Sequence, residues 1–132
     1  MNENDNINEK VQEADLLKQL NIFDISYNAL LMILFAIFLN LQYVYGERAK
    51  LLDKLNNTNI SEQLPNLGDS RKISNQIFLF VTSIFLFINY DGYKTAVESN
   101  ASSKEQNVSF KGFISTLLIL VATSISKTNL EV

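Results

Sequence analysis

The sequence predicts an all-α membrane protein in which three transmembrane helices follow an N-terminal amphipathic helix. Two observations favour this fold. The 132 residues are enough for one compact unit, and the apolar residues are gathered into three blocks that contain no Asp, Glu, Lys or Arg. Helices of a soluble bundle usually keep a charged face toward water. Because these blocks have no such face, we expect each of them to face lipid.

Residues 1–24 form an acidic polar tail. Within the tail, apolar side chains recur at steps of three and four, which is the spacing of one face of an α-helix. These side chains are Ile7, Val11, Ala14, Leu17 and Leu20. We expect a short amphipathic helix that either lies on the lipid headgroups or docks on a partner protein.

Residues 25–132 form the predicted membrane domain. A helix over 25–45 is about 31 Å long, which matches the roughly 30 Å of a bilayer's hydrocarbon core. A helix over 73–90 is about 27 Å long and spans with slight thinning of the bilayer or with snorkelling of side chains at its ends. The third block, 113–126, covers only about 21 Å. We therefore predict a third span over 110–126, in which Lys111 snorkels to the surface, or else a re-entrant segment.

The two connections, 46–72 and 91–109, are predicted to be loops. The helical pattern of the first span continues to Asn56 and Asn57, and Pro65 and Gly68 then indicate an irregular segment. The second connection opens with an Asp-Gly pair at 91–92, which is a turn signal, and continues with small polar residues. We expect this second connection to be a flexible surface loop.

Tyrosines lie at the ends of the spans, where amphipathic rings prefer the headgroup level. We interpret all five as interface anchors: Tyr27, Tyr43, Tyr45, Tyr90 and Tyr93.

Small and weakly polar side chains form a stripe on each span, most regularly on the second, where three of them are spaced by seven. The stripe residues are Asn28, Asn40, Asn75, Thr82, Asn89, Ser115, Thr116, Thr123 and Ser126. Helices in lipid associate through small residues and interhelical hydrogen bonds. The stripes therefore predict where the spans pack, or alternatively the lining of a pore built from several copies.

The composition excludes several classes of function. The chain has no His and no Cys, so it lacks an imidazole base, a thiolate nucleophile and the usual ligands of zinc and haem. The spans also lack the buried charge that ion-coupled transport generally requires, and a net charge of −3 gives no basic surface for nucleic acid. We predict no enzymatic activity, no catalytic, cofactor-binding or metal-binding residue, and infer no small-molecule substrate.

Two functional hypotheses remain. The first is a non-catalytic accessory or interaction subunit of a membrane complex, a class that includes protectors of the bacteriocin-immunity type. Its partners are the lipid bilayer and either another membrane protein or a second copy of the chain. The side of the first loop, with Lys127, carries six Lys and Arg against five on the opposite side, and those of the first loop lie closer to the spans. This favours a multi-pass cell-membrane protein with its N-terminus outside. Richness in Asn, Ile, Lys and Phe favours a bacterial, AT-rich genome.

The second hypothesis is a pore former. In its length, its three spans and its outside N-terminus, the chain resembles three-span phage holins, and this resemblance in architecture implies a homo-oligomeric pore or small channel. The C-terminal residues 127–132 depart from the holin pattern because they lack a basic cluster.

Overall fold

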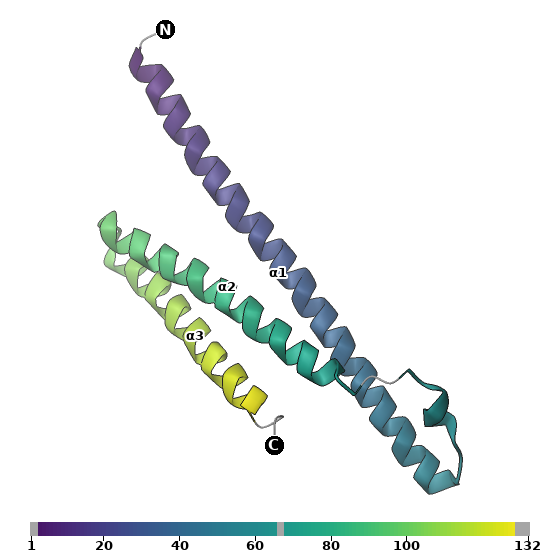
Figure 1. The fold of residues 1–132 in the computed structure, drawn as a ribbon. Coiled ribbons are helices and arrows are strands. Elements are labelled where there is room, and N and C mark those ends of the chain that lie inside the picture. The colour runs from purple at the N-terminus through teal and green to yellow at the C-terminus, as the bar shows by residue number, and fades with distance from the viewer. Residues whose placement is uncertain (1–2, 66–67, 129–132) are drawn as a thin grey trace.

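The computed structural model describes residues 3–65 and 68–128, and every regular element within them is helical. The elements are α1 (Glu3–Asn56), the short 3₁₀ helix η1 (Ile60–Gln63), α2 (Ser70–Glu98) and α3 (Ser103–Thr128), as Figure 1 shows. The helices α1, α2 and α3 are each long and apolar enough to cross a membrane. The prediction of an all-α chain with three such helices is confirmed.

The helix α1 is continuous over 54 residues and is about 81 Å long. The expectation of a separate short N-terminal helix is therefore wrong, because the amphipathic segment and the first apolar block belong to one helix. At the expected boundary, the Asn28 side-chain amide donates to the Asp24 carbonyl oxygen at 2.8 Å, one turn back in the helix. Extending an existing helix requires no new nucleation, and residues 3–45 contain neither Pro nor Gly to interrupt it.

The C-terminal end of α1 lies where the sequence predicts, at Asn56. Asn57 adopts a left-handed conformation with φ of 52°, which asparagine tolerates better than most residues. The Thr58 amide then donates to the Asp53 carbonyl oxygen at 3.1 Å, which is the closing bond of a Schellman motif. The short helix η1 follows, and Pro65 lies just beyond its end.

The connection between α2 and α3 is much shorter than predicted. The helix α2 continues through Gly92 to Glu98 and α3 begins at Ser103, so the expectation of a loop over 91–109 is wrong. Asn100 has φ of 52°, and the Ala101 amide donates to a carbonyl oxygen of the last turn of α2 at 3.0 Å. A second Schellman motif therefore ends α2.

The start of α3 is fixed by a capping box. The Glu105 carboxylate accepts a hydrogen bond from the Ser102 amide at 3.0 Å, and the Ser102 hydroxyl accepts one from the Glu105 amide at 3.3 Å. Each side chain thus satisfies a backbone donor that the first turn of a helix leaves unpaired. The four residues 102–105 read Ser-Ser-Lys-Glu, so this helix start is visible in the sequence.

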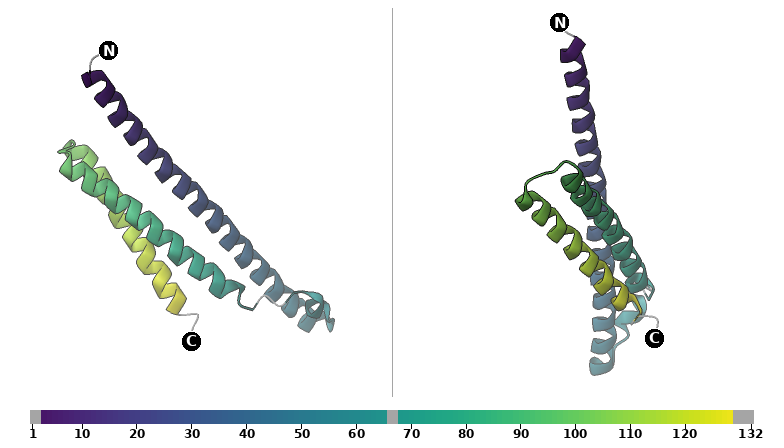
Figure 2. Two further views of the ribbon diagram at one scale, coloured as in Figure 1. Left: turned by 45° about the horizontal axis from the view of Figure 1, so that its top comes forward. Right: turned by 90° about the vertical axis from the view of Figure 1, so that its left-hand side faces the viewer.

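The helix α2 is central. It packs antiparallel to α1 and to α3, whereas no contact joins α1 to α3 within the described ranges (Figure 2). The long helix α1 extends beyond the α2–α3 hairpin at both ends (Figures 1 and 2). The three helices therefore form an open arrangement rather than a closed bundle.

The third predicted span, 110–126, lies inside α3. With 26 residues this helix is about 39 Å long, which exceeds the roughly 30 Å of a hydrocarbon core. It is unbroken, so it can cross a bilayer without a re-entrant turn.

Candidate functional site

The polar stripe of α2 meets α3 through a short chain of hydrogen bonds. The Asn89 side-chain amide donates to the Thr116 hydroxyl at 2.7 Å, and that hydroxyl donates to the Gly112 carbonyl oxygen at 2.9 Å. A Cβ atom on Gly112 would lie 3.6 Å from Asn89 Oδ1, which is an ordinary van der Waals distance, so Gly112 lies at the helix contact without being required there for steric reasons. Of the predicted stripe residues, the structure brings Asn89 and Thr116 together.

Aromatic rings close the α2–α3 contact near the connecting turn. Tyr90 lies 5.6 Å from Phe113, and Tyr93 lies 5.4 Å from Phe110 and 6.4 Å from Phe113, measured between ring centroids. Tilted and offset arrangements of this kind contribute about 0.5–1.5 kcal/mol beyond area burial in aqueous proteins. Two of the five predicted interface anchors therefore also pack helices together.

The other predicted anchors belong to α1. Tyr27 and Tyr45 are exposed, and Tyr43 is half-buried beneath the Arg71 guanidinium, whose central carbon lies 5.9 Å from the ring centroid. This cation–π contact joins α1 to the first turn of α2. The role of all five tyrosines at a membrane interface stays a prediction.

The contact between α1 and α2 uses a face of α2 that the sequence analysis did not single out. Ser74 is fully buried, and its hydroxyl donates to the Ala36 carbonyl oxygen at 2.9 Å. Ala29 and Val81 are also buried, each seven residues from one of these two. The available signal was the heptad spacing of Ser74 and Val81, which runs one residue before Asn75 and Thr82.

An ion pair continues this antiparallel register toward the N-terminal part of α1. Lys18 Nζ lies 3.5 Å from Asp91 Oδ2, and both side chains remain largely exposed. An exposed pair of this kind contributes about 0–1 kcal/mol. This ion pair places the Asp91–Gly92 dipeptide beside α1. The dipeptide is predicted to be a turn but lies within the helix α2.

The remaining stripe residues make no interhelical hydrogen bond within the described part of the chain. Thr82 is buried, Asn40, Asn75 and Thr123 are half-buried, and Asn28, Ser115 and Ser126 are exposed.

Several hydroxyl groups on α2 and α3 are bound to their own helix. Thr82, Ser83, Thr116, Thr123 and Ser124 each donate to the carbonyl oxygen four residues earlier, at 2.5–2.9 Å. A peptide carbonyl is too weak a base to activate a hydroxyl as a nucleophile. Among the described residues, no group of three or more Asp and Glu is placed to hold a metal ion.

A compact corner joins the end of α1 to η1, outside the predicted spans. The Asp53 carboxylate accepts the Thr58 hydroxyl at 2.5 Å, the Ile60 amide at 2.9 Å and the Ser61 amide at 2.7 Å. Hydrogen bonds from Ser61 and Thr58 hold the pKa of Asp53 well below its usual range, because they stabilise the charged form.

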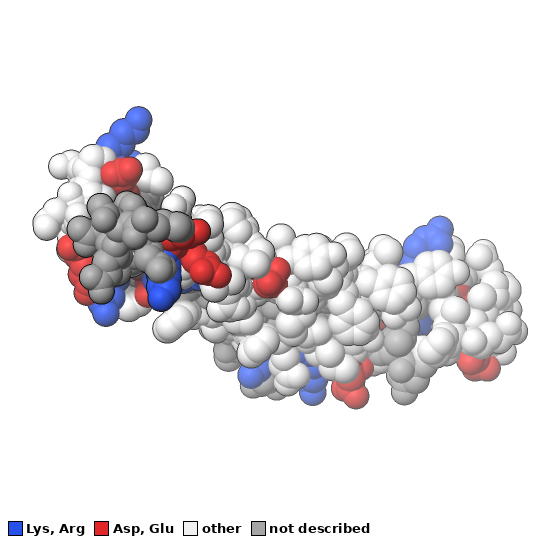
Figure 3. All heavy atoms as spheres, turned by 90° about the horizontal axis from the view of Figure 1, so that it is seen from above, with Lys and Arg blue, Asp and Glu red and all other residues white. Residues whose placement is uncertain are grey.

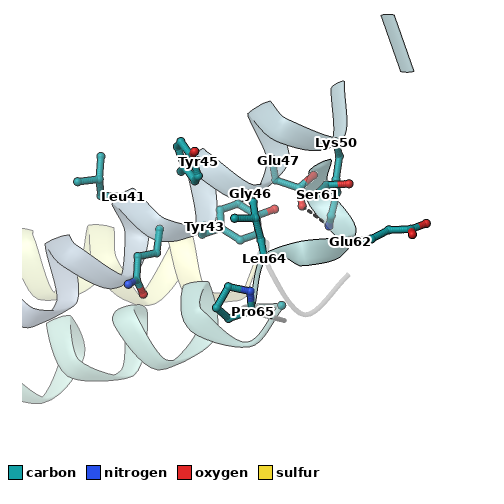
Figure 4. Close-up of a pocket in the computed structure, with 12 residues that line it drawn as sticks. Leu41, Tyr43, Tyr45, Gly46, Glu47, Lys50, Ser61, Glu62, Leu64 and Pro65 are labelled. Carbon is teal, nitrogen blue, oxygen red and sulfur yellow. Dashed lines mark hydrogen bonds and ion pairs between the residues drawn. The ribbon is translucent and has the colours of Figure 1, made fainter. Parts of the chain in front are cut away.

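A groove of about 770 Å³ lies between the end of the first apolar block and the η1 segment, as Figure 4 shows. Tyr43, Tyr45 and Leu64 contribute to its lining. At its edge Lys50 donates to Glu47 at 2.7 Å, and this bond raises the pKa of Lys50. The sequence analysis did not predict the groove, because it exists only where the loop folds back on α1.

Charged side chains are unevenly distributed over the surface. On the face seen in Figure 3, a broad area to the right of the centre has no Lys, Arg, Asp or Glu, and most charges lie toward the two ends and along the lower edge. Such an area suits a lipid or protein environment rather than water.

Comparisons with known proteins give no further guide to function. No protein-family model matches the chain, and neither the curated proteins nor the solved structures contain a match.

Proposed function

We propose that this chain is a small multi-pass protein of the cell membrane that acts without catalysis, as an interaction subunit of a membrane complex. One observation carries the proposal: α1 is about 81 Å long and packs on α2 with one face, which leaves its Leu-rich face uncovered. Leu30, Leu34 and Leu41 on that face are 57–64% exposed. The uncovered face is available for a partner.

The use of the polar residues supports packing over a pore. Asn89 and Thr116 bond to each other across α2 and α3, and the Ser74 hydroxyl bonds to α1. Groups that satisfy each other inside one chain are not free to line a water path between copies. We place the N-terminus outside because of the Lys and Arg of the first loop.

The proposal is tested on the full chain carrying an affinity tag and expressed at its native level. The complex is extracted in mild detergent, and its mass and composition are measured. Two variants with the same substitution, which removes packing without adding a polar group, are compared: Leu34→Ala on the free face of α1 and Leu118→Ala on α3, each of which is 63% exposed in the wild-type structure.

We expect a complex of fixed stoichiometry that Leu34→Ala weakens and Leu118→Ala does not. A monomer in detergent would contradict the proposal. Rapid dye leakage from vesicles that contain only this protein would instead favour the pore.

A further inference from the structure

The uncovered face of α1 carries a heptad repeat. From Leu16 to Leu55, positions separated by alternating steps of four and three are apolar or Tyr, with the one exception of Arg48. We call this row the α1 ladder. Each of its members other than Arg48 is exposed by 51–78%. Steps of four and three, kept over five heptads, are the a and d pattern of a coiled coil.

The ladder lies on the side of α1 opposite to α2. When its residues are assigned to positions a and d, the buried Ala29 and Ala36 occupy position c and Lys18, which pairs with α2, occupies position f. Positions c and f lie on the outer side of a coiled-coil helix, away from the a and d seam. A partner on the ladder therefore does not compete with α2.

Lipid cannot cover the whole ladder. Its 40 residues extend over about 60 Å along the helix axis, whereas the hydrocarbon core is about 30 Å thick. If α1 crosses the membrane, about half of the ladder lies outside the hydrocarbon. Charged residues flank both ends of the ladder, so the part outside the hydrocarbon is divided between these two ends. Leu16 and Leu20 lie beside Lys18, and Leu51 and Leu55 lie beside Asp53 and Lys54. Exposed leucines at these ends favour a protein partner, because burial away from water stabilises them.

We propose that the occupant of the α1 ladder is the same ladder of a second copy, in a parallel coiled coil that passes through the membrane. This rests on the proposed function, whose partner it names. Two copies inserted with the same topology present their ladders in parallel. When the copies are related by a two-fold axis, the ladder of one contacts the same ladder of the other, so a single surface forms both sides of the interface. A strip about 60 Å long and 10 Å wide gives a total buried area on the order of 1,200 Å², at the lower end of specific interfaces.

The charges near the membrane fit a parallel register. Arg48 occupies position a, and Glu47 directly before it occupies position g. In a parallel pair, position a of one helix lies beside position g of the other. The two Arg48 side chains then face each other across the seam, and each also lies beside Glu47 of the second copy, whose opposite charge offsets the repulsion.

Cysteine cross-linking tests the proposal directly, since the chain has no native cysteine. Leu20→Cys and Leu51→Cys place a thiol on the ladder at its two ends. Asp15→Cys and Lys50→Cys place matched thiols at position c, within five residues of each ladder thiol. Each full-length variant is reconstituted at low density in vesicles that contain only this protein, and is oxidised. Carbonate extraction reports insertion independently.

We expect the ladder thiols to form disulfide dimers at least tenfold faster than the position c thiols. Equal rates, or no dimer in vesicles into which the protein has inserted, would overturn the proposal. If native membranes nevertheless yield a complex with a different protein, the interaction role stands and only the second copy is refuted. Failure to insert would refute the membrane role itself.

Discussion

The hydrogen bond between Asn89 and Thr116 allows a quantitative test of how α2 and α3 are held together. Asn89→Leu and Thr116→Val each remove one partner of the 2.7 Å bond. Interhelical hydrogen bonds in membranes contribute about 0.6 kcal/mol on average and up to about 1.7 kcal/mol. A double-mutant cycle should therefore give a coupling free energy of about 0.6–1.7 kcal/mol, or roughly a 3-fold to 18-fold change in the equilibrium constant.

The assay follows separation of the two helices. Fluorophores attached at Lys72→Cys and Ser126→Cys, both exposed in the wild-type structure, report energy transfer between α2 and α3 while sodium dodecyl sulfate is titrated into mixed micelles. The matched control is the same cycle with Thr123→Val. The Thr123 hydroxyl bonds to the Ile119 carbonyl oxygen of its own helix at 2.8 Å, so we expect no coupling to Asn89.

The reasoning would be refuted by a coupling below about 0.2 kcal/mol, which is smaller than the usual additivity error for independent sites. An equal coupling in the Thr123 cycle would also refute it, since the effect would then not depend on the bond.

Three further predictions concern other contacts. Ala36→Leu overpacks a fully buried position and should destabilise the α1–α2 contact by about 1–3 kcal/mol, measured in a titration of the same kind with the second fluorophore on α1 in place of α3. Ile37→Leu, at a position 51% exposed, should change this value by less than about 0.5 kcal/mol. Asp53→Asn should speed hydrogen exchange of the Ile60 and Ser61 amides, which donate hydrogen bonds to the Asp53 carboxylate. The pKa of Asp53 is lowered in the folded chain. In the wild type, protection of these amides from exchange should therefore be complete above the unfolded pKa of about 4 and should be lost as the pH falls through the lower folded pKa. Protection that disappears near pH 6 would contradict this prediction. Ser102→Ala should cost about 0.5–2 kcal/mol through the lost cap, whereas Ser103→Ala next to it should change stability by less than about 0.5 kcal/mol, as measured by thermal unfolding.

Local signals in the sequence determined much of the architecture. The uncharged blocks predicted the three helices that are apolar enough to cross a membrane, and the pattern after residue 45 placed the end of α1 at Asn56. The heptad of Asn75, Thr82 and Asn89 predicted a packing stripe, and in the structure Asn89 bonds to α3. These features depend on residues within a few turns of one another.

The α2–α3 turn was also predictable in principle. Asn100 and the capping-box residues Ser102 and Glu105 mark the end of α2 and the start of α3 in the sequence. The Asp-Gly pair at 91–92 instead predicts a turn there, so the predicted end of α2 comes too early. Helix pairing decided against that turn, since Tyr93 packs against α3 and Asp91 pairs with α1.

Tertiary structure alone decided how the helices are combined. In the tertiary structure α2 is the central helix, α1 packs on its Ser74 face and α3 packs on its Asn89 face. The groove between α1 and η1 also forms only at this level. Periodicity tells which side chains share a face of one helix, because that is a local property of the backbone. It does not tell which helix covers that face: the Ser74 hydroxyl finds its acceptor 38 residues away, and such a match depends on the shapes of two helices together.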